Sequence, residues 1–594
     1  MKKFFNLFHN EYVLGSSSLT PAYLITKAKQ PEMNIKETIQ QLIEDALDKC
    51  MQSGVFTSSD LPPFTLETPK SRDHGDYATN VAMISAPLVK KPPRKIAEQI
   101  IAHIPSSSTV VEKVEIAGPG FINFYISRSC WLRAFQDISL QGNDYGTSQL
   151  GQGKKINLEY VSANPTGPLH IGHGRGAAVG DALANILRTV GYDVSREYYI
   201  NDTGNQMGLL GKSVYTRYLQ LLGREITFPP DFYQGNYIEE IAQLIVSQHK
   251  NHYEKTPEAE ALSHCTAFAV DHILRGIQKD LSDFDAHFDT WFSEKTLHEE
   301  NAVERALGAL KEKGHTYTSE GNLWFNSTLF GDDKDRVVLR DTGVPTYFAS
   351  DIAYHLNKLE RGFDRIINIW GADHHGYIPR IKAVIEAFGK SRETVEVLLV
   401  QFVNLLRGGT PVAMSTRSGT FVTLREVIDE VGTDAVKYSF LTRRSDAPLD
   451  FDLEIAKKQS DENPVYYVQY AHARICNIVT FAAKEGISLP QPDTVPLELL
   501  ILPEEIHLIK QLSSYPELIE NCALSLEPHR ITIYLNELVS NFHRYYHLGK
   551  LESKNRVITE NRELSIARLW LVNTIRVLIK NALTLLGVSA PEKM

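Results

Sequence analysis

Two histidines one helical turn apart, His170 and His173, lie in a segment rich in proline and glycine. Residues 164–174 read Asn-Pro-Thr-Gly-Pro-Leu-His-Ile-Gly-His-Gly. Glycine lets a backbone approach a phosphate closely, and a helix N-terminus offers free N–H groups and the positive end of a dipole. The histidine rings can donate hydrogen bonds to phosphate oxygens. The segment therefore predicts a nucleotide site with ATP as its occupant; the alternative is that both histidines cap or pack the loop.

Apolar spacing predicts the elements that would position these histidines. Residues 156–160 alternate between apolar and polar side chains, as a strand does, and apolar residues recur along one helical face over 179–190. A strand, a glycine-rich loop and a helix open a nucleotide-binding α/β sheet. Apolar segments at 366–370 and 397–403 fit further strands of a parallel sheet that is buried on both faces.

Length and composition exclude several classes of protein. The 594 residues exceed what one hydrophobic core organises and predict roughly three to five domains. No apolar stretch approaches the roughly 18 residues of a membrane-spanning helix, so we expect no membrane partner. The net charge of −10 argues against a protein that coats nucleic acid, although residues 530–594 carry ten Lys or Arg and five Glu, a local net charge of +5 that favours a polyanion. Five cysteines without a Cys-x-x-Cys pair fit a reduced cytosol and predict neither a disulfide framework nor a cysteine-built zinc site.

The sequence divides into four stretches. The first has no helical or strand period, and helical spacing begins only after Met33, so the chain has either an N-terminal extension or a true start at Met33. The third is the Rossmann-type α/β domain with a parallel sheet, and a charged helical insertion interrupts it at about 205–335. We expect an extension, a small α+β domain, the α/β catalytic domain and an all-α bundle at 1–32, 33–145, 150–460 and 461–594, respectively.

The histidine loop resembles the signature of class I aminoacyl-tRNA synthetases. Residues 162–169 resemble the arginyl-tRNA synthetase family in particular. The resemblance extends from about residue 33 to residue 594. Four further segments that follow in the family's order are 199–206, 370–376, 414–419 and 463–474.

The resemblance implies ATP-dependent attachment of L-arginine to tRNA(Arg) through an arginyl-adenylate, with transfer to the 2′-hydroxyl of the terminal adenosine. No protein nucleophile is needed, so such a site works by holding the reactants and stabilising charge on phosphorus. Mg²⁺ is expected with ATP, held chiefly by ATP and water, and no protein metal site is expected. The implied catalytic residues are His170, Gly172, His173 and Arg417, and the implied ATP contacts are Pro168, His170, Gly172, His173, Gly371, Asp373, His374, Met414 and Ser415.

One segment departs from the family pattern. Class I synthetases commonly close over ATP with a Lys-Met-Ser-Lys-Ser loop, whereas residues 413–418, within the corresponding loop at about 412–420, read Ala-Met-Ser-Thr-Arg-Ser. Some arginyl enzymes that lack this loop have a lysine just before the first signature histidine, and Thr-Gly-Pro stands there in this chain. Arg417 is therefore our candidate for stabilising pyrophosphate, because guanidinium groups pair well with phosphate. The alternative is that Arg417 is an ordinary surface charge.

Recognition of arginine requires carboxylates, because the guanidinium fork matches a carboxylate at two points and an ammonium group does not. Alternation places Glu159 on the strand face opposite Leu158 and Tyr160, and Tyr347 and Asp351, four residues apart, share one helical face. The resemblance places the arginine side chain among Glu159, Tyr347 and Asp351, and its α-amino group near Asn164. The alternatives are that Glu159 pairs with a neighbouring lysine and that the other two begin a solvated helix.

An Asp-His-His triplet at 373–375 could suggest a metal site. Adjacent side chains of a strand point to opposite faces, which makes a shared ion awkward there. We therefore expect Gly371, Asp373 and His374 to contact the adenosine of ATP.

The remaining candidates concern tRNA. Residues 71–80 and the basic run 90–95 resemble the tRNA-elbow domain of the family, in which Tyr77 and Asn80 would contact an unpaired base. The C-terminal bundle resembles the anticodon-binding domain, with Arg544 and Tyr545 as expected contacts, although Tyr545 could equally be a core residue. A charge run is also often only a solvated face.

The sequence favours a cytoplasmic, monomeric arginine–tRNA ligase over two alternatives. A cysteinyl-type class I enzyme would need a thiolate-rich zinc site, which five dispersed cysteines do not offer. A catalytically inactive tRNA-binding paralogue is suggested by the missing lysines and opposed by the intact histidines and carboxylates. A panel of amino acids in tRNA-dependent pyrophosphate exchange separates the three.

Overall fold

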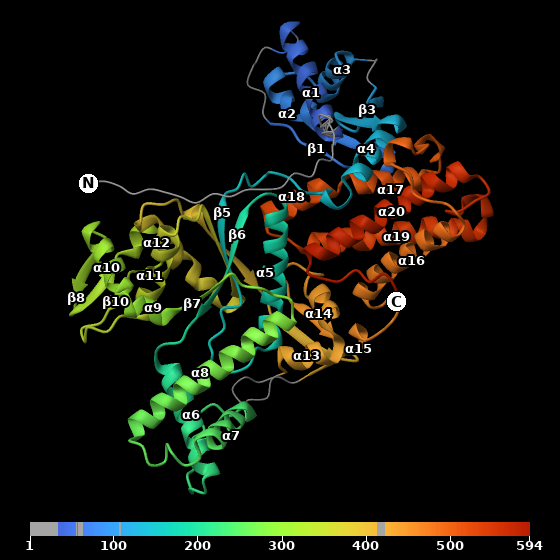
Figure 1. Cartoon of the computed structure of the whole chain (residues 1–594). Coiled ribbons are helices and arrows are strands. Elements are labelled where there is room, and N and C mark those ends of the chain that lie inside the picture. Colours follow the sequence, from blue (N-terminus) through green and yellow to red (C-terminus); the bar gives the residue numbers. More distant parts are fainter. Residues whose placement is uncertain (1–33, 55, 57–62, 70, 106–108, 413–421) are drawn as a thin grey trace, which may run out of the picture. The chain divides into compact units, whose positions relative to one another are not determined.

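The computed structural model describes residues 34–54, 56, 63–69, 71–105, 109–412 and 422–594 (Figure 1). The chain forms two compact units, Met1–Tyr125 and Ile126–Met594, which we describe separately. Among the described residues, no helix has the length and apolarity that a bilayer span requires.

The first unit is the small α+β domain that the sequence predicts. Its four-stranded sheet has the order β1-β2-β4-β3, in which β1 pairs antiparallel with β2, and β2 antiparallel with β4. Helix α1 buries a stripe that includes Ile39, Ile43 and Cys50. The elements are α1 (Ile35–Gln52), β1 (Leu66–Glu67), β2 (Tyr77–Thr79), α2 (Val81–Val89), α3 (Pro93–Ala102), β3 (Val111–Ala117) and β4 (Phe121–Ile126).

The second unit is built on a five-stranded sheet with the order β12-β11-β5-β6-β7, in which all strands are parallel. Ile156 and Leu158 of the central strand β5 are fully buried, as a sheet covered on both faces requires. Helix α5 follows β5 directly after the histidine loop, which confirms the Rossmann-type fold. The elements are β5 (Lys155–Glu159), α5 (Ile171–Thr189), β6 (Asp193–Ile200), β7 (Thr290–Ser293), β11 (Arg365–Gly371) and β12 (Val395–Val400).

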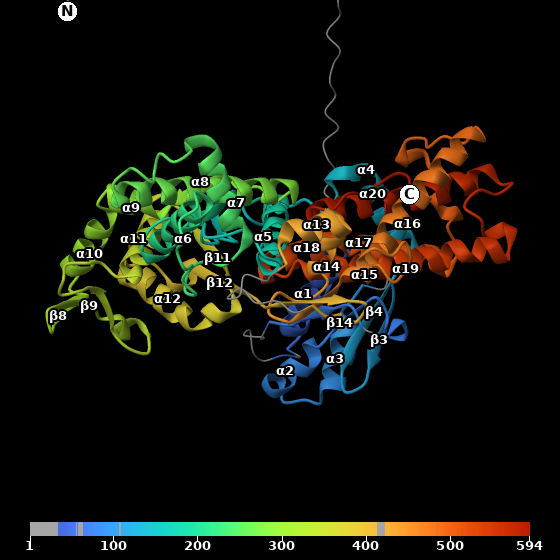
Figure 2. The same ribbon diagram turned by 90° about the horizontal axis from the view of Figure 1, so that it is seen from below.

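The insertion differs from the predicted range of about 205–335. Strand β7 pairs with β6 in the main sheet, so the helical insertion ends before Thr290. Its helices α6 (Asn205–Leu221), α7 (Asn236–His249) and α8 (Glu258–Asp283) lie side by side in both views (Figures 1 and 2). The sequence hides β7 because this strand is short and half-buried, without a continuous apolar run.

A second excursion separates β7 from β11. It contains a small antiparallel sheet with the order β10-β9-β8 and ends in α11, the helix that carries Tyr347 and Asp351. Its elements are α9 (Glu294–Glu299), α10 (Ala302–Glu312), β8 (Thr316–Ser319), β9 (Asn322–Phe325), β10 (Arg336–Leu339) and α11 (Tyr347–Glu360).

Short elements connect the main sheet to the helical bundle. Strands β14, β13 and β15 form a further sheet in that order, and α13 and α14 lie between β14 and β15 along the chain. The elements are α12 (Ile378–Ala387), β13 (Val403–Arg407), β14 (Thr410–Pro411), α13 (Leu424–Val431), α14 (Thr433–Phe440), β15 (Leu449–Asp452) and α15 (Leu453–Ala456).

The C-terminal stretch is the predicted all-α bundle, and one earlier helix joins it. Helix α4 (Arg128–Gln141) belongs to the second unit because the Arg128 guanidinium donates to the Leu500 carbonyl at 2.9 Å and the Tyr145 hydroxyl donates to the Leu512 carbonyl at 3.0 Å. The first unit therefore ends near Tyr125, before the predicted boundary at 145. The bundle helices are α16 (Pro464–Lys484), α17 (Pro503–Ser513), α18 (Tyr515–Ser525), α19 (His529–Leu551) and α20 (Arg562–Leu585).

Candidate active site

The two signature histidines cap the helix that they begin. The Nδ1 atom of His170 accepts a hydrogen bond from the Gly172 N–H at 3.1 Å, and the Nδ1 atom of His173 accepts one from the His170 N–H at 3.2 Å. The rings stack with their centroids 3.6 Å apart. The capping role that the sequence offered as an alternative is therefore real, and it fixes both rings at the N-terminus of α5.

This capping determines what the rings can offer to a ligand. Because each Nδ1 accepts a hydrogen bond, the proton of each neutral imidazole lies on Nε2. Burial lowers the pKa of His170, and burial together with the neighbouring His170 lowers the pKa of His173 to about 3. Both side chains are therefore neutral Nε2–H donors at physiological pH.

The base of the predicted closing loop lies against this site. Thr423 forms an isolated β-bridge with His170, and the Leu424 N–H donates to the Leu169 carbonyl at 2.8 Å. A Cβ atom added at Gly174 would lie 2.6 Å from Leu424, so glycine permits this close approach. Pro168 is half-buried in the loop before the histidines. Three predicted residues of the closing loop lie outside the described residues, namely Met414, Ser415 and Arg417.

The chain between β5 and this loop is strained. Val161 and Ser162 have φ angles of +67° and +41°, a region that β-branched and other L-residues rarely adopt. In this conformation the Ser162 hydroxyl donates to Glu159 Oε1 at 3.0 Å and accepts from the Tyr199 N–H at 3.1 Å. The strain therefore helps to orient Glu159 at the carboxyl end of the central strand.

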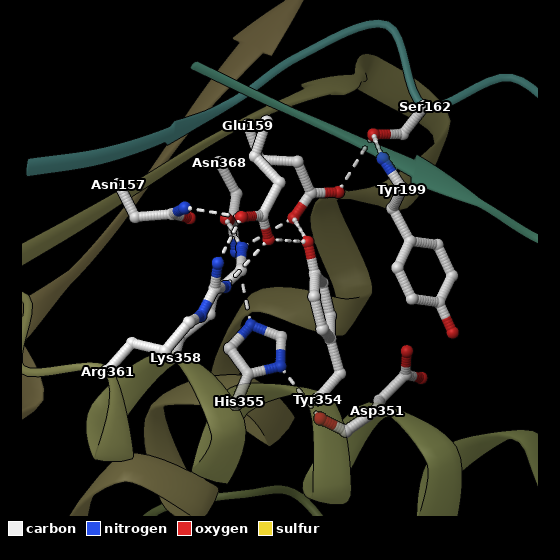
Figure 3. Close-up of polar contacts among 11 residues, drawn as sticks. Asn157, Glu159, Ser162, Tyr199, Asp351, Tyr354, His355, Lys358, Arg361 and Asn368 are labelled. Atoms are coloured by element: carbon white, nitrogen blue, oxygen red, sulfur yellow. Dashed lines mark hydrogen bonds and ion pairs between the residues drawn. The ribbon is translucent and has the colours of Figure 1, made fainter. Parts of the chain in front are cut away.

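Glu159 is buried and ion-paired. Its side chain lies at the end of β5, where ligands of open α/β sheets bind. Its Oε2 atom is 2.5 Å from Nζ of Lys358 on α11 (Figure 3). The pairing of Glu159 with a lysine, which the sequence offered as an alternative, is therefore present, and the lysine is distant in sequence.

Asp351 faces the same region from a position about two turns before Lys358 on α11. Its carboxylate accepts a hydrogen bond from the Tyr377 hydroxyl, and in Figure 3 it points toward Tyr199. Burial of the carboxyl group raises the pKa of Asp351 to about 7; Tyr377 opposes this shift, and the charges of Glu294 and Glu159 add to it. Among the described residues, no lysine or arginine forms an ion pair with Asp351. Its negative charge is therefore available to a cation.

Tyr347 and Asn164 meet the segment that follows β6. Tyr347 is 58% exposed, and a Cβ atom added at Gly204 would lie 2.9 Å from its hydroxyl oxygen. The Asn164 amide donates to Gln206 Oε1 at 2.8 Å. Both residues therefore contact the segment 199–206. Tyr199 of this segment also lies at the site, although it was not predicted as a site residue.

The Asp-His-His triplet adopts a different conformation from the one expected. Strand β11 ends at Gly371 and a 3₁₀ turn spans Ala372–Tyr377, so the argument from alternating strand faces was wrong. Both side chains of the Asp373 and His374 pair are well exposed, with Oδ2 and Nε2 3.7 Å apart. Within the described ranges, no group of three or more His, Cys, Asp or Glu could hold a metal ion.

The predicted tRNA residues have different environments. Tyr77 is half-buried on β2, and the Asn80 side chain accepts from the Thr65 N–H at 3.1 Å. Arg544 is exposed on α19, whereas Tyr545 is 1% exposed and donates to Glu505 at 3.3 Å. The prediction that Tyr545 contacts tRNA is wrong, because its ring belongs to the core of the bundle.

Aromatic and basic side chains of α16 and α19 form a cluster whose α16 members were not predicted as tRNA contacts. The Arg474 guanidinium lies 4.6 Å from the ring centroid of Tyr470 and 5.1 Å from that of Tyr546. The Tyr466 and Tyr470 rings stack 5.9 Å apart. The four-residue spacing of 466, 470 and 474 within the quoted segment could have revealed this face.

Three family models match consecutive parts of the chain. They are the arginyl tRNA synthetase N terminal domain at residues 37–126, the catalytic domain of class I (R) tRNA synthetases at 134–445 and the DALR anticodon binding domain at 468–594. The first model ends within one residue of the end of the first compact unit.

Curated relatives match along nearly the whole chain. The arginine–tRNA ligase of Desulfosudis oleivorans is 54% identical over 562 residues, which cover 94% of this chain and 100% of that protein. The arginine–tRNA ligase of Syntrophotalea carbinolica is 51% identical over 560 residues, with the same coverage. The solved arginyl-tRNA synthetase of Thermus thermophilus, 21% identical, has the same fold with a TM-score of 0.71 and covers 94% of this chain and 100% of its own.

Proposed function

The chain belongs to the arginyl-tRNA synthetases, class I enzymes that use ATP to attach L-arginine to tRNA(Arg), and from this premise we propose how its own residues act. In the first step a carboxylate oxygen of arginine bonds to the α-phosphorus of ATP and the bond to pyrophosphate breaks. In the second, the terminal ribose 2′-hydroxyl bonds to the arginyl carbonyl carbon, loses its proton, and AMP leaves.

His170 and His173 stabilise the first transition state. Their Nε2–H groups stand at the N-terminus of α5, where backbone N–H groups also favour an anion. Fixed donors aimed at a developing charge are each worth on the order of 10²–10³ in rate. Because both imidazoles are neutral and their Nδ1 atoms accept hydrogen bonds, each ring presents its one N–H, on Nε2, to the phosphate.

Mg²⁺ accompanies ATP in this proposal and neutralises charge on the phosphates. In this proposal the ion is held chiefly by ATP and water, because Mg²⁺ keeps several waters and binds substrate phosphates. Arg417 as the pyrophosphate contact, and Met414 and Ser415 as ATP contacts, remain predictions of the sequence, as do the roles of Pro168, Gly371, Asp373 and His374.

Asp351 is the principal counter-charge for the arginine guanidinium. The observation that carries this assignment is a carboxylate without a cationic partner in the described chain, beside a second carboxylate, Glu159. Tyr347 and Asn164, which meet the segment after β6, complete the proposed arginine site.

The test is Asp351→Asn, which removes the charge and keeps the shape. We expect the KM for arginine in aminoacylation to rise about 10- to 100-fold, because a charge-assisted hydrogen bond is worth about 1.5–3 kcal/mol. The KM for ATP should change less than about threefold. Equal increases in both KM values would contradict the assignment.

The N-terminal domain and the C-terminal bundle bind tRNA in this proposal. The first unit contacts the elbow through Tyr77 and Asn80, and the bundle contacts the anticodon loop through Arg544 and the aromatic cluster of α16 and α19. The support is the likeness of residues 37–126 and 468–594 to domains of this family. A monomeric state and a cytoplasmic location stay predictions.

A further inference from the structure

A buried charge network links the proposed arginine site to the main sheet (Figure 3). It contains two ion pairs, and strands β5, β6 and β11 and helix α11 all contribute side chains. The pairs are Glu159 with Lys358 and Glu197 with Arg361; the neutral members are Asn157, Ser162, Tyr354, His355 and Asn368.

Lys358 is fully buried, and each of its donors has a partner. Its Nζ atom is 2.5 Å from Glu159 Oε2 and 3.0 Å from Asn368 Oδ1, and it lies 4.4 Å from the centroid of the Tyr354 ring. An ammonium group has three N–H donors, so two oxygens and one aromatic face satisfy it. The position of this lysine is therefore fixed.

Two neutral side chains, Asn368 and His355, connect Lys358 to the backbone of Asp351 through hydrogen bonds. The Asn368 amide nitrogen is 3.2 Å from His355 Nε2, and His355 Nδ1 is 2.8 Å from the Asp351 carbonyl oxygen. Burial, aided by the charge of Lys358, lowers the pKa of His355 to about 3, so the ring is neutral. Its Nδ1–H donates to the carbonyl and its Nε2 accepts from Asn368.

The second ion pair joins Arg361 to Glu197, so Lys358 is the cation that pairs with Glu159. Arg361 donates to both oxygens of Glu197, at 2.6 and 2.9 Å. The Tyr354 hydroxyl is 2.5 Å from Glu197 and 3.1 Å from Glu159. A hydroxyl has one proton, and the shorter distance assigns it to Glu197. Lys358 is therefore the only cation that the described residues place against Glu159, and the two pairs together carry no net charge.

We propose that Lys358 is a positioning residue for arginine binding: it fixes the Glu159 carboxylate and cancels its charge, so that of these two carboxylates only Asp351 faces the guanidinium without a cationic partner. This inference rests on the proposed arginine site. Ser162 fixes Oε1 and Lys358 fixes Oε2, so the plane of the carboxylate is set before the substrate arrives. A guanidinium fork requires such a fixed plane, which a mobile carboxylate would not provide.

The test measures KM values for arginine and ATP in aminoacylation of tRNA(Arg) by the full-length enzyme. Lys358→Met leaves Glu159 buried without a cationic partner, so this carboxyl group will bind a proton or its side chain will rotate. We expect the KM for arginine to rise about tenfold or more while the KM for ATP changes less than about threefold. Lys358→Arg keeps the cation and should remain within about threefold of the parent in both values.

A double-mutant cycle tests whether Lys358 acts through Glu159. In the Glu159→Gln background, Lys358→Met should change the KM for arginine by less than about twofold, because the carboxylate to be positioned is gone. A change of fivefold or more in that background, or equal effects on arginine and ATP, overturns the proposal. The double variant Glu159→Gln/Lys358→Met has neither charge of the buried ion pair. It therefore tests whether Lys358 acts through Glu159 even if Lys358→Met alone does not fold.

Lys437→Met is the matched control. Lys437 is also fully buried and pairs with Asp181 at 3.1 Å, away from Glu159. Lys437→Met should lower the melting temperature of the enzyme and leave the KM for arginine within about twofold of the parent value. The same measurements distinguish failure of the proposed arginine site from failure of this inference. If Asp351→Asn and Glu159→Gln both leave the KM for arginine unchanged, the proposed site is wrong. If both raise the KM for arginine and Lys358→Met does not, only the role of Lys358 is wrong.

Discussion

Asp351 differs from Glu159 and Glu197 in how its charge is compensated. Glu159 and Glu197 each have a cationic partner, and hydrogen bonds from Arg361 hold the pKa of Glu197 below its usual value despite the opposing effect of burial. Asp351 accepts from a neutral tyrosine hydroxyl, and burial raises its pKa to about 7. The free enzyme at neutral pH is therefore a mixture of protonated and ionised Asp351.

This mixture predicts that arginine binding depends on pH. The guanidinium is always charged, and it binds the ionised carboxylate. Below the pKa of about 7 the affinity for arginine should therefore fall, approaching tenfold per pH unit, and above it the affinity should level off. Calorimetric titration of the enzyme with arginine between about pH 5.5 and 8 measures this. Asp351→Asn should bind weakly and without this dependence; a wild-type affinity that is flat across the range would contradict the shift.

The sequence predicted the side chains of the proposed arginine site but not their partners. Alternation along the strand placed Glu159, and the spacing of four placed Tyr347 and Asp351. Lys358 could not be assigned to Glu159, because the two are 199 positions apart and only the pairing of β5 with β11 brings α11 over the strand end. The prediction for Tyr545 was wrong for a local reason. Tyr545 continues the buried stripe of Leu538 and Phe542, and the helical spacing of these three residues is visible in the sequence.

At the level of elements, long amphipathic helices and buried strands were predictable and short paired strands were not. Helix α5 and strands β5 and β11 have periods that the sequence shows directly. Strand β7 is half-buried, and its place in the main sheet depends on pairing with β6, so the predicted insertion was too long. Helix α4 was assigned to the first domain because sequence order says nothing of its contacts with α17 and α20.

Helix α5 must lie close to the sheet for its histidines to stand over the strand ends. A Cβ atom added at Gly180 would lie 2.3 Å from the ring of Tyr160, which is fully buried. Gly180→Ala should therefore destabilise the fold by about 1–3 kcal/mol through overpacking and raise the KM for ATP, since the helix must move. Denaturant unfolding and aminoacylation kinetics measure the two effects.

Gly176→Ala in the same helix is the control for stability. A Cβ atom there meets nothing within 4 Å, and alanine is the better helix former by up to about 1 kcal/mol. This variant should be as stable as the parent or more so. Equal destabilisation by both substitutions would show that the contact with Tyr160 does not decide the position of the helix.

For the whole molecule, charge is distributed unevenly along the chain. The chain is acidic overall, whereas its last 65 residues carry a net charge of +5. The aromatic cluster of Tyr466, Tyr470, Arg474 and Tyr546 lies on α16 and α19 of the same bundle. Composition predicts a polyanion contact in this stretch, but only the packing of α16 against α19 brings the rings of the two helices together.

Tyr470 and Tyr545 offer matched substitutions that test this face of the bundle. Tyr470 is 37% exposed, so its ring can stack on a base, and such stacking is worth about 1–3 kcal/mol per base. Tyr470→Ala should therefore raise the KM for tRNA(Arg) by about 5- to 100-fold and leave the KM for arginine and ATP unchanged. Tyr545→Phe removes only a buried hydroxyl that bonds to Glu505, so it should lower the free energy of unfolding by about 1 kcal/mol without changing the KM for tRNA. Aminoacylation rates at varied tRNA concentration distinguish the two variants, and a larger tRNA defect for Tyr545→Phe than for Tyr470→Ala would reverse our assignment of exposed and core rings.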